Sequence, residues 1–466
     1  MEQNVFIPVP DPKEQGPEMV SGITDWFDTL PTTVGIESCR DEFIQPQQGL
    51  QVNNQSINFR FQASNDEALD MSQTRLCMDM RINLANGDDL PNNVNNIVTT
   101  TNGIGHAFWK NITVRVNGET ITNSDNMYAH RGDLYTRLNY TGLIQDEGSL
   151  TLAGFDEESQ PVDSFADENA CTPWRDAAVK DGLTRRYRLH RVPFRITSPV
   201  HTDICQQDKL LPPNTVVEMI FERNSDAFCL VTKHANADYK LNLVSCQLKV
   251  HFKKLNAELL NAALKKQMQG YRLLFPLERI SMTYFTRIPN TTDWSEPHPL
   301  YGQGNILPSK IYMALVKQTA FTGAYDEDPF NYVGDNLGEV CLRLSGETKP
   351  YPMLKMHRGG VGDNTDIIEP LSALLQSMGV LFDRNKRTHL NIYNYHNRNF
   401  IFGWDLNPNP QGSKNTFNLP DTRQAELHML LRQAYNQAHT LIVYSVYPSE
   451  LALDNEGKVK LSENAT

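Results

Sequence analysis

The alternation of apolar and polar positions predicts β-strands along most of the chain. The most regular run places an apolar residue at every second position, namely Leu76, Met78, Met80, Ile82 and Leu84. A period of two puts one side of a strand against a core and the other side in water. Similar runs occur at 56–61, 187–196, 217–221, 280–288, 340–344, 400–404, 425–431 and 441–447. The run 311–316 is apolar on both sides, which predicts a central strand.

Three segments break this alternation with a helical spacing, at 126–143, 256–270 and 366–382. In the middle segment, Asn256 can cap the N-terminus of the helix, Lys265 and Lys266 are favourable in its last turn, and Gly270 can end it. We expect its apolar face to lie against a larger surface. That face is Leu259, Leu260, Ala263, Leu264 and Met268. The strand-like run before it, 239–252, slips phase near Ser245, which predicts a bulge.

A short internal repeat indicates that the chain is duplicated around this helix. The letters RVNGET at 115–120 recur as RLSGET at 343–348, an offset of 228 residues. Each copy ends an alternating strand, turns on a glycine (Gly118 or Gly346) and precedes a predicted helix. We therefore expect two similar antiparallel β-sandwiches with equivalent hairpins.

The length of 466 residues fits two domains of about 200 residues each. We expect an extended arm at 1–45, a first sandwich at 46–253, the linker helix at 254–270, a second sandwich at 271–448 and a mobile polar tail at 449–466. The arm is polar and contains several prolines, but Trp26 and Phe27 stand together in it. Two adjacent aromatic residues in such an arm suggest an anchor that docks into a groove of its own domain or of a neighbour.

Composition narrows the class of protein. Seven scattered cysteines without a Cys-x-x-Cys pair are typical of a reducing compartment. The polar start is unlike a signal peptide, and no run of about 18 apolar residues occurs, so we expect an intracellular product without a membrane span. A net charge of −12 argues against a protein that coats nucleic acid. Residues 139–174 hold eight acidic residues and no Lys or Arg, which predicts a long exposed loop.

Motifs for catalysis, cofactors or metals are not found. The twelve histidines form no His-Glu-x-x-His pattern, and Cys229 with His234 lacks a second pair of ligands. The glycine-rich stretch 359–362 is not followed by Gly-Lys-Ser/Thr, and no Gly-x-Ser-x-Gly occurs. We therefore predict no catalytic residue, no cofactor and no metal ligand, although a carboxylate pair brought together by folding stays open.

Four stretches resemble a known family. They are residues 106–118, 222–228, 255–270 with the following strand, and 320–331, in which Ala-Phe-x-Gly-x-Tyr followed by Pro-Phe-Asn is the most specific element. Together they resemble the major capsid proteins of polintons (Mavericks) and adintovirus-like DNA viruses. The resemblance spans roughly residues 20–448 and leaves out the acidic stretch 139–174.

This resemblance implies an all-β fold of two tandem jelly rolls joined by a helix. It further implies a homotrimer that forms a pseudo-hexagonal capsomer, and an icosahedral shell of many capsomers around double-stranded DNA. Neighbouring capsomers, penton proteins and minor capsid proteins would be the partners, and the location would be the virion. The alternatives are a double jelly-roll glycosidase acting on glycoproteins and a cellular adhesion or lectin module. Both are normally secreted and disulfide-bonded, unlike the protein expected here.

Overall fold

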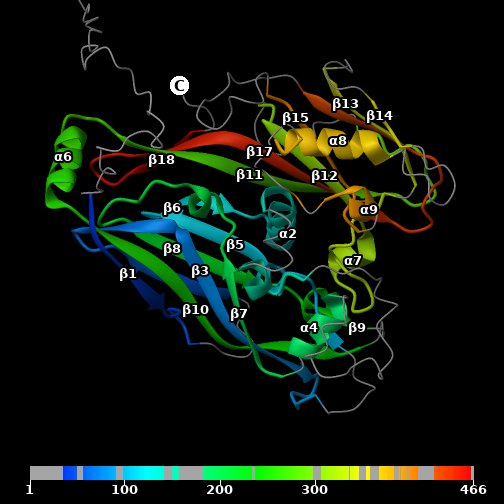
Figure 1. Ribbon diagram of the computed structural model, residues 1–466, viewed down its shortest axis with the longest axis horizontal. Coiled ribbons are helices and arrows are strands. Elements are labelled where there is room, and N and C mark those ends of the chain that lie inside the picture. Colours follow the sequence, from blue (N-terminus) through cyan, green and yellow to red (C-terminus); the bar gives the residue numbers. More distant parts are fainter. Residues whose placement is uncertain are drawn as a thin grey trace, which may run out of the picture.

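The computed structural model describes residues 35–49, 56–90, 98–140, 149–156, 182–190, 192–232, 237–296, 306–334, 336–345, 353–356, 367–381, 388, 390–395, 398–407 and 424–462. Within these ranges strands dominate and form two β-sandwiches that lie side by side (Figure 1). Helix α6 (Ala257–Met268) joins them at one end of the molecule. None of the described helices has both the length and the apolar character needed to cross a bilayer.

The first sandwich consists of two antiparallel sheets and a small pair. One sheet has the order β1 (Ile36–Ile44), β10 (Tyr239–Leu255), β3 (Glu67–Leu84) and β7 (Phe194–Pro199). The facing sheet has the order β2 (Ser56–Gln62), β8 (Val216–Arg223), β5 (Trp109–Val116) and β6 (Glu119–Asn123). Strands β4 (Val98–Thr100) and β9 (Leu230–Thr232) pair separately.

The second sandwich repeats this plan. One sheet has the order β11 (Leu273–Arg287), β17 (His439–Leu453), β12 (Lys310–Lys317) and β15 (Ile401–Asp405), and β18 (Val459–Ser462) pairs with β17. The facing sheet has the order β14 (Leu354–Lys355), β13 (Leu337–Leu344) and β16 (Ala425–Leu431). Single bridges from Asp293 and Glu296 to β16 take the place of a further edge strand.

Both sandwiches have the jelly-roll topology. In the first, the opening strand β1 pairs with the closing strand β10, and the second strand β2 pairs with β8, the last strand of the facing sheet. In the second, β11 likewise pairs with β17, and the segment at 293–296 bridges to β16. Strands that alternate between two facing sheets in this way are characteristic of jelly rolls. The predicted fold class is therefore confirmed.

The 228-residue repeat corresponds to equivalent strands. Strand β5 begins at Trp109 and β13 begins at Leu337, and 337 − 109 = 228. Their ends differ by the same number, since 344 − 116 = 228. The next residues, Asn117 and Ser345, have positive φ angles of 51° and 49°. Each donates its backbone N–H over 2.8 Å to a carbonyl at the start of the last strand of the facing sheet, Val216 O beside β8 and Gln424 O beside β16. Gly118 also has a positive φ, while Gly346 lies outside the described residues.

Several local predictions are confirmed. The side chain of Asn256 caps α6 by accepting a hydrogen bond of 2.8 Å from Glu258 N, and Gly270 follows the helix with a positive φ. The register of β10 against β3 shifts between Leu243 and Ser245, where the bulge is predicted. Helices α2 (Tyr128–Asn139) and α8 (Ile368–Ser377) lie within the two other predicted helical segments.

The expected boundaries of the arm and the tail are wrong. Residues 36–44 form strand β1, whose side chains are exposed except for the half-buried Ile44, so no alternation marks it. Backbone pairing with β10 holds this strand in place. The polar tail expected from Ser449 is also wrong, because β17 continues to Leu453 and β18 pairs with it. Leu451 and Leu453 are buried opposite the start of β11, which extends the core.

One predicted strand is a helix. Residues 187–190 belong to α4 (Gly182–His190) rather than to a strand that continues to Ile196. Its buried side chains are Leu183, Arg186, Tyr187 and His190, which recur every three or four residues. The remaining short helices among the described residues are α1 (Ile104–Ala107), α5 (Asp226–Cys229), α7 (Gln318–Thr322), α9 (Ile392–Tyr395) and the 3-10 turns η1 (Ser149–Ala153) and η4 (Asp203–Gln206).

Candidate functional site

Helix α2 lies at the junction between the two sandwiches and is enclosed by both. It follows β6 of the first sandwich, yet ten of its twelve residues are buried. A helix on the surface of a single domain normally keeps one polar face in water. The burial of α2 on nearly all sides therefore indicates that the two sandwiches form one packed unit around it.

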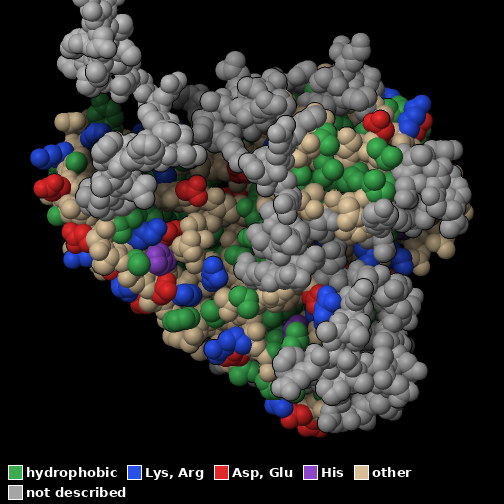
Figure 2. All heavy atoms as spheres, viewed as in Figure 1, with side chains coloured by type: hydrophobic (Ala, Val, Ile, Leu, Met, Phe, Trp, Pro, Cys, Tyr) green, Lys and Arg blue, Asp and Glu red, His purple; other side chains and the backbone are tan. Residues whose placement is uncertain are grey.

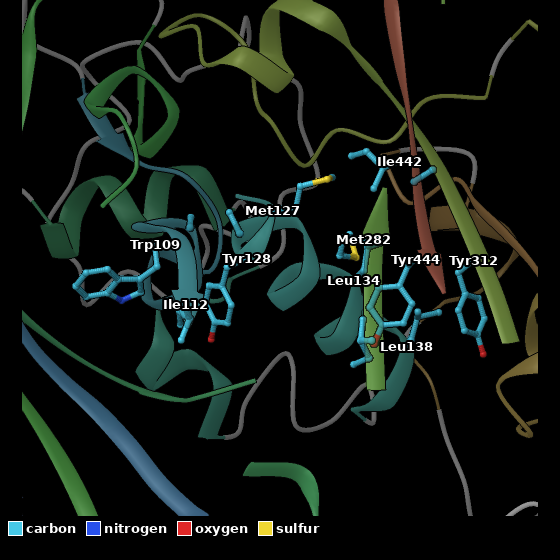
Figure 3. Close-up of a cluster of buried hydrophobic side chains, with 14 of the residues drawn as sticks. Trp109, Ile112, Met127, Tyr128, Leu134, Leu138, Met282, Tyr312, Ile442 and Tyr444 are labelled. Atoms are coloured by element: carbon cyan, nitrogen blue, oxygen red, sulfur yellow. The ribbon is translucent and has the colours of Figure 1, made fainter. Parts of the chain in front are cut away.

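One side of α2 is apolar and covers the second sandwich. Figure 3 shows Leu134 and Leu138 beside Met282 and Tyr444, which belong to strands β11 and β17. All four side chains are buried. Helix α8 covers the same sheet, since the Tyr312 hydroxyl of β12 donates to Ser377 O over 3.1 Å. Strands β12 and β17 of this sheet are therefore buried on both faces.

A buried ion pair links α2 to both sandwiches. Arg131 Nη2 donates to Asp203 Oδ1 over 2.6 Å, and both side chains are at most 2% exposed. The same carboxylate accepts a bond from Ile280 N over 3.2 Å, while Thr122 Oγ1 donates to its other oxygen over 2.8 Å. Arg131 Nη1 also donates to Ile280 O over 3.3 Å. Strand β6, turn η4, helix α2 and strand β11 are thus held by a single pair of charges.

A second polar group lies on the opposite side of α2, two residues after Arg131. Asp133 Oδ2 accepts hydrogen bonds from Arg137 Nε over 2.8 Å and from the Tyr332 hydroxyl over 2.9 Å. Arg137 also donates to Asn399 Oδ1. Burial, together with the charge of Asp133, raises the pKa of Tyr332 well above its usual value. These bonds connect α2 to two loops of the second sandwich, so the junction has fixed polar contacts as well as apolar ones.

An aromatic cluster closes the junction beside α2. The His130 ring stacks on Phe321, with ring centres 5.2 Å apart, and meets the edges of Phe228 and Phe330. Phe228 comes from the first sandwich, whereas Phe321 and Phe330 come from the second. Gly323 has a φ of 102°, and a Cβ there would lie 3.0 Å from Phe228 N, so only glycine fits.

This contact brings together two of the stretches that carry the family resemblance. Residues 222–228 and 320–331 lie far apart in the sequence but meet at the junction. Backbone bonds extend the contact, because Thr232 N donates to Tyr325 O over 2.7 Å and the Tyr325 hydroxyl donates to Tyr239 O over 2.8 Å. The most specific element of the sequence resemblance is therefore the segment that fixes the two sandwiches together.

Two further histidines are buried under α2. The rings of His106 and His201 stack with centres 4.4 Å apart, and a Cβ on Gly132 would lie 2.8 Å from His106. Burial lowers the pKa of His106 to about 4 and that of His130 to about 3. Burial also lowers the pKa of His201 well below its usual value, with smaller contributions from His106 and Arg131. All three rings are thus neutral near pH 7.

A groove of about 1130 Å³ opens beside the aromatic cluster. Its lining includes the ion pair of Arg223 with Asp226, together with Lys110, Tyr284 and Phe321. Among the residues that the structure describes, no three His, Cys, Asp or Glu side chains gather as metal ligands. The expected absence of catalysis and of cofactors stays a prediction.

The structure places only part of the residues singled out by the sequence. The proposed anchors Trp26 and Phe27 lie outside the described residues, as do the glycines at 359–362. The acidic stretch 139–174 is described only at 139–140 and 149–156. Sequence reasoning missed Arg131 and Asp203. The available signal was indirect: α2 carries charged residues and a glycine where a surface helix would show a clean apolar stripe.

Comparison of the sequence with known proteins gives one distant relative and no match to a family model. The relative is the uncharacterized protein F54H12.2 of Caenorhabditis elegans. It is 21% identical over 365 residues, which cover 75% of this chain and 80% of the relative.

Comparison with solved structures gives matches over nearly the whole chain. A chain of the Sputnik virophage structure matches with a TM-score of 0.61 and 11% identity, covering 100% of this chain and 94% of that one. The mavirus major capsid protein matches with a TM-score of 0.54 and 11% identity, covering 99% and 96%. The Faustovirus major capsid protein matches with a TM-score of 0.54 and 10% identity, covering 91% and 92%. The chain thus has the double jelly-roll fold of these viral proteins.

Proposed function

We propose that the chain is a major capsid protein that assembles into an icosahedral shell around a double-stranded DNA genome. The observation that carries this proposal is the double jelly roll itself, which matches two major capsid proteins over at least nine tenths of both chains. The sequence stretches quoted above favour a polinton or adintovirus-like source. The glycosidase and lectin alternatives gain no support from these comparisons.

The duplicated architecture suggests how such a shell is tiled. Each chain supplies two similar blocks, so three chains supply six and form a pseudo-hexagonal unit with one gene product. The rigid junction around Arg131 and Asp203 supports this proposal, because a capsomer needs both blocks of a chain to keep a fixed relative position. Neighbouring capsomers, penton proteins and minor capsid proteins are the proposed partners, and the virion is the proposed location.

The long polar loops at 139–184 and 405–422 are both expected from the sequence to project outward, but the strands beside them run toward opposite ends of the molecule. Strand β3 runs from Glu67, near α6, to Leu84 at the opposite end of the molecule. Strand β7 begins opposite Met80, close to that opposite end. The insertion between β6 and β7 therefore rejoins the sandwich at the end away from α6. By contrast β15 runs toward the α6 end, with Ile401 opposite Ala314 and Asp405 opposite Lys310. Residues 141–148, 157–181 and 408–423 lie outside the described residues. We propose that the acidic insertion faces outward and that the α6 end faces the interior.

The oligomeric state tests the proposed function. Light scattering on the purified protein should give three times 52.9 kDa, and this mass should persist on dilution because tiling subunits bury large lateral surfaces. A monomer at all concentrations from micromolar to nanomolar would contradict the capsid proposal. Weak binding of the trimer to duplex DNA at physiological salt is also expected, given the net charge of −12.

A further inference from the structure

Helix α6 has large apolar side chains that the described residues leave exposed. The expectation that this face lies against a larger surface is met only in part by the described chain, since Leu260 and Ala263 are half-buried and none of the helix residues is fully buried. Leu259 is 48% exposed, Leu264 is 51% exposed and Met268 is 79% exposed. Tyr271 and Leu274, just after the helix, are 66% and 44% exposed. These five side chains are here called the α6 patch, and they are the densest group of exposed large apolar residues along the sequence of the described part of the chain.

The first 34 residues of the chain lead directly to this patch. Gly35 O accepts a hydrogen bond of 3.1 Å from Asn256 N, at the start of α6. A Cβ on Gly35 would lie only 3.5 Å from Leu259 Cδ1. Phe27 precedes Gly35 by eight residues, which can span up to about 28 Å, whereas the twelve residues of α6 extend over about 18 Å. The segment is therefore long enough to reach the far end of α6 from its own chain.

The apolar residues of this segment have a spacing that suits the patch. Between positions 19 and 30 its apolar residues recur every three or four positions, a spacing typical of an amphipathic helix. They are Met19, Val20, Ile23, Trp26, Phe27 and Leu30. The adjacent aromatic pair supplies the large apolar surface that anchors contacts of this kind.

The charges of the two surfaces are opposite. Residues 1–34 contain six acidic residues and a single basic one, Lys13. Lys265, Lys266 and Arg272 beside the patch are exposed, and Glu258 in the first turn is the acidic residue of α6. Opposite charges around an apolar contact favour one partner and one orientation.

We propose that residues 18–30 of each chain dock on the α6 patch of the same chain, with Trp26 and Phe27 against Leu264 and Met268 and with Asp25 and Asp28 toward Lys265 and Lys266. A second copy of the chain and a lipid surface are the competing occupants. The contact does not depend on the chain being a capsid protein, so it can fail or hold independently of that proposal.

Hydrogen exchange of the full-length protein tests this contact. Replacing both anchors (Trp26→Ala with Phe27→Ala) should accelerate amide exchange in residues 257–270 on the order of tenfold, because the docked segment no longer protects the helix. The matched control replaces two exposed apolar residues at the other end of the molecule, Leu189→Ala with Val192→Ala, and should leave α6 unchanged. Unchanged exchange of α6 in the anchor variant would overturn the proposal.

A charge exchange tests the orientation. Lys265→Glu with Lys266→Glu should also accelerate exchange in α6, and adding Asp25→Lys with Asp28→Lys should restore slow exchange. Failure of the combined variant to restore it would contradict the proposed facing of the two segments.

A photo-crosslinking residue at position 27 identifies the occupant. The product should contain a peptide from 259–274 and run as a single chain on a denaturing gel. Products of twice the chain mass would assign the patch to a second copy. If the anchor variant changes nothing but vesicles with anionic lipid slow the exchange of α6, the occupant is a membrane surface and the proposal is wrong.

Discussion

The two equivalent sheets β1-β10-β3-β7 and β11-β17-β12-β15 share one topology but have opposite surroundings. The closing strand β17 is buried on both sides from His439 to Tyr447. The closing strand β10 is buried on alternate positions over most of its length. Its outer side pairs charges in water, as in the contact of Lys249 with Asp41. Figure 2 shows positive and negative side chains interspersed over the side where β1 and β10 lie.

The difference between these sheets comes from the insertions rather than from the strands. Helix α2, which belongs to the insertion after β6 of the first sandwich, covers the outer face of the second sheet together with α8. No described helix covers the outer face of the first sheet in the same way. The two halves of the duplicated fold are therefore asymmetric: one sheet joins the two sandwiches, and the other has a charged outer face.

The largest effect is expected from breaking the ion pair at the junction. Replacing Arg131 with methionine leaves Asp203 buried without its countercharge, so the free energy of unfolding should fall by about 3–5 kcal/mol. The midpoint of urea denaturation would measure this loss. The control is Arg195→Met on the outer face of the first sheet, where the pair with Asp79 is exposed. Exposed pairs contribute little, so the control should unfold near the parent midpoint.

Equal losses in these two variants would contradict the comparison. They would mean that the first sheet, too, depends on its outer charges. A larger loss for Arg195 would imply that this outer face is already buried between copies of the chain in solution.

Truncating the apolar side of α2 should have the next largest effect. Leu134 is fully buried between the sandwiches, so Leu134→Ala should lower the free energy of unfolding by about 2–5 kcal/mol through lost contacts and the cavity left behind. Leu189 on α4 offers a matched control, because it is also helical but 55% exposed. Its replacement by alanine should stay within about 0.5 kcal/mol of the parent.

The melting temperatures of the two leucine variants would measure this difference. A small effect at Leu134 would show that α2 can move away from the second sandwich without loss of stability. The junction would then be a loose contact rather than a packed one.

Acid should weaken the junction through its buried histidines. The folded pKa of His130 is about 3, below the usual value near 6.5, so the native state binds fewer protons than the unfolded state in between. Stability is therefore complete above pH 6.5 and declines as the pH falls toward 3. At pH 5 the loss from such a group is on the order of 2 kcal/mol.

Replacing His130 with phenylalanine removes this contribution. Both ring nitrogens of His130 lack a hydrogen-bond partner among the described residues, and its neighbours are aromatic, so phenylalanine fits the site. The variant should be more stable than the parent at pH 5 and should lose less stability between pH 8 and pH 5. An unchanged slope of thermal stability against pH would contradict the assignment.

The sequence reveals those features that depend on neighbouring residues. The alternation at 76–84, the cap at Asn256 and the bulge near Ser245 follow from short-range chemistry, and each is confirmed. The repeat of six letters locates the equivalent strands β5 and β13. Strand β1 could not be predicted because its side chains are exposed and show no apolar alternation. Backbone hydrogen bonds to β10 hold it in place.

The junction could not be predicted from the sequence because its residues are brought together by the fold. Arg131 and Asp203 are 72 positions apart, and the carboxylate of Asp203 accepts hydrogen bonds from both Arg131 and the backbone N–H of Ile280. From the sequence alone, a charged residue on a helix indicates a solvent-exposed face, because the second sandwich that covers it is not known. The α6 patch illustrates the opposite error, since its apolar spacing predicts burial and the described chain leaves it exposed.

The smallest effect concerns the two equivalent hairpins and should differ in sign between them. Asn117 and Ser345 both hold a positive φ, which glycine adopts without strain. Asn117 also accepts a bond of 2.9 Å from Val216 N through its side chain and donates one of 2.8 Å to Gly457 O. Asn117→Gly should therefore destabilise the protein by about 1 kcal/mol through these lost bonds.

Ser345→Gly removes the strain of a positive φ at a residue other than glycine, while the bond from its backbone N–H to Gln424 O is kept. It should leave stability unchanged or raise it by up to about 1 kcal/mol. Chemical denaturation of both single variants and of the double variant would compare the hairpins directly. Because the sites are in different sandwiches, their effects should add. If both variants lose stability equally, the side chain of Asn117 has no special role, and the two hairpins are equivalent in energy as well as in backbone shape.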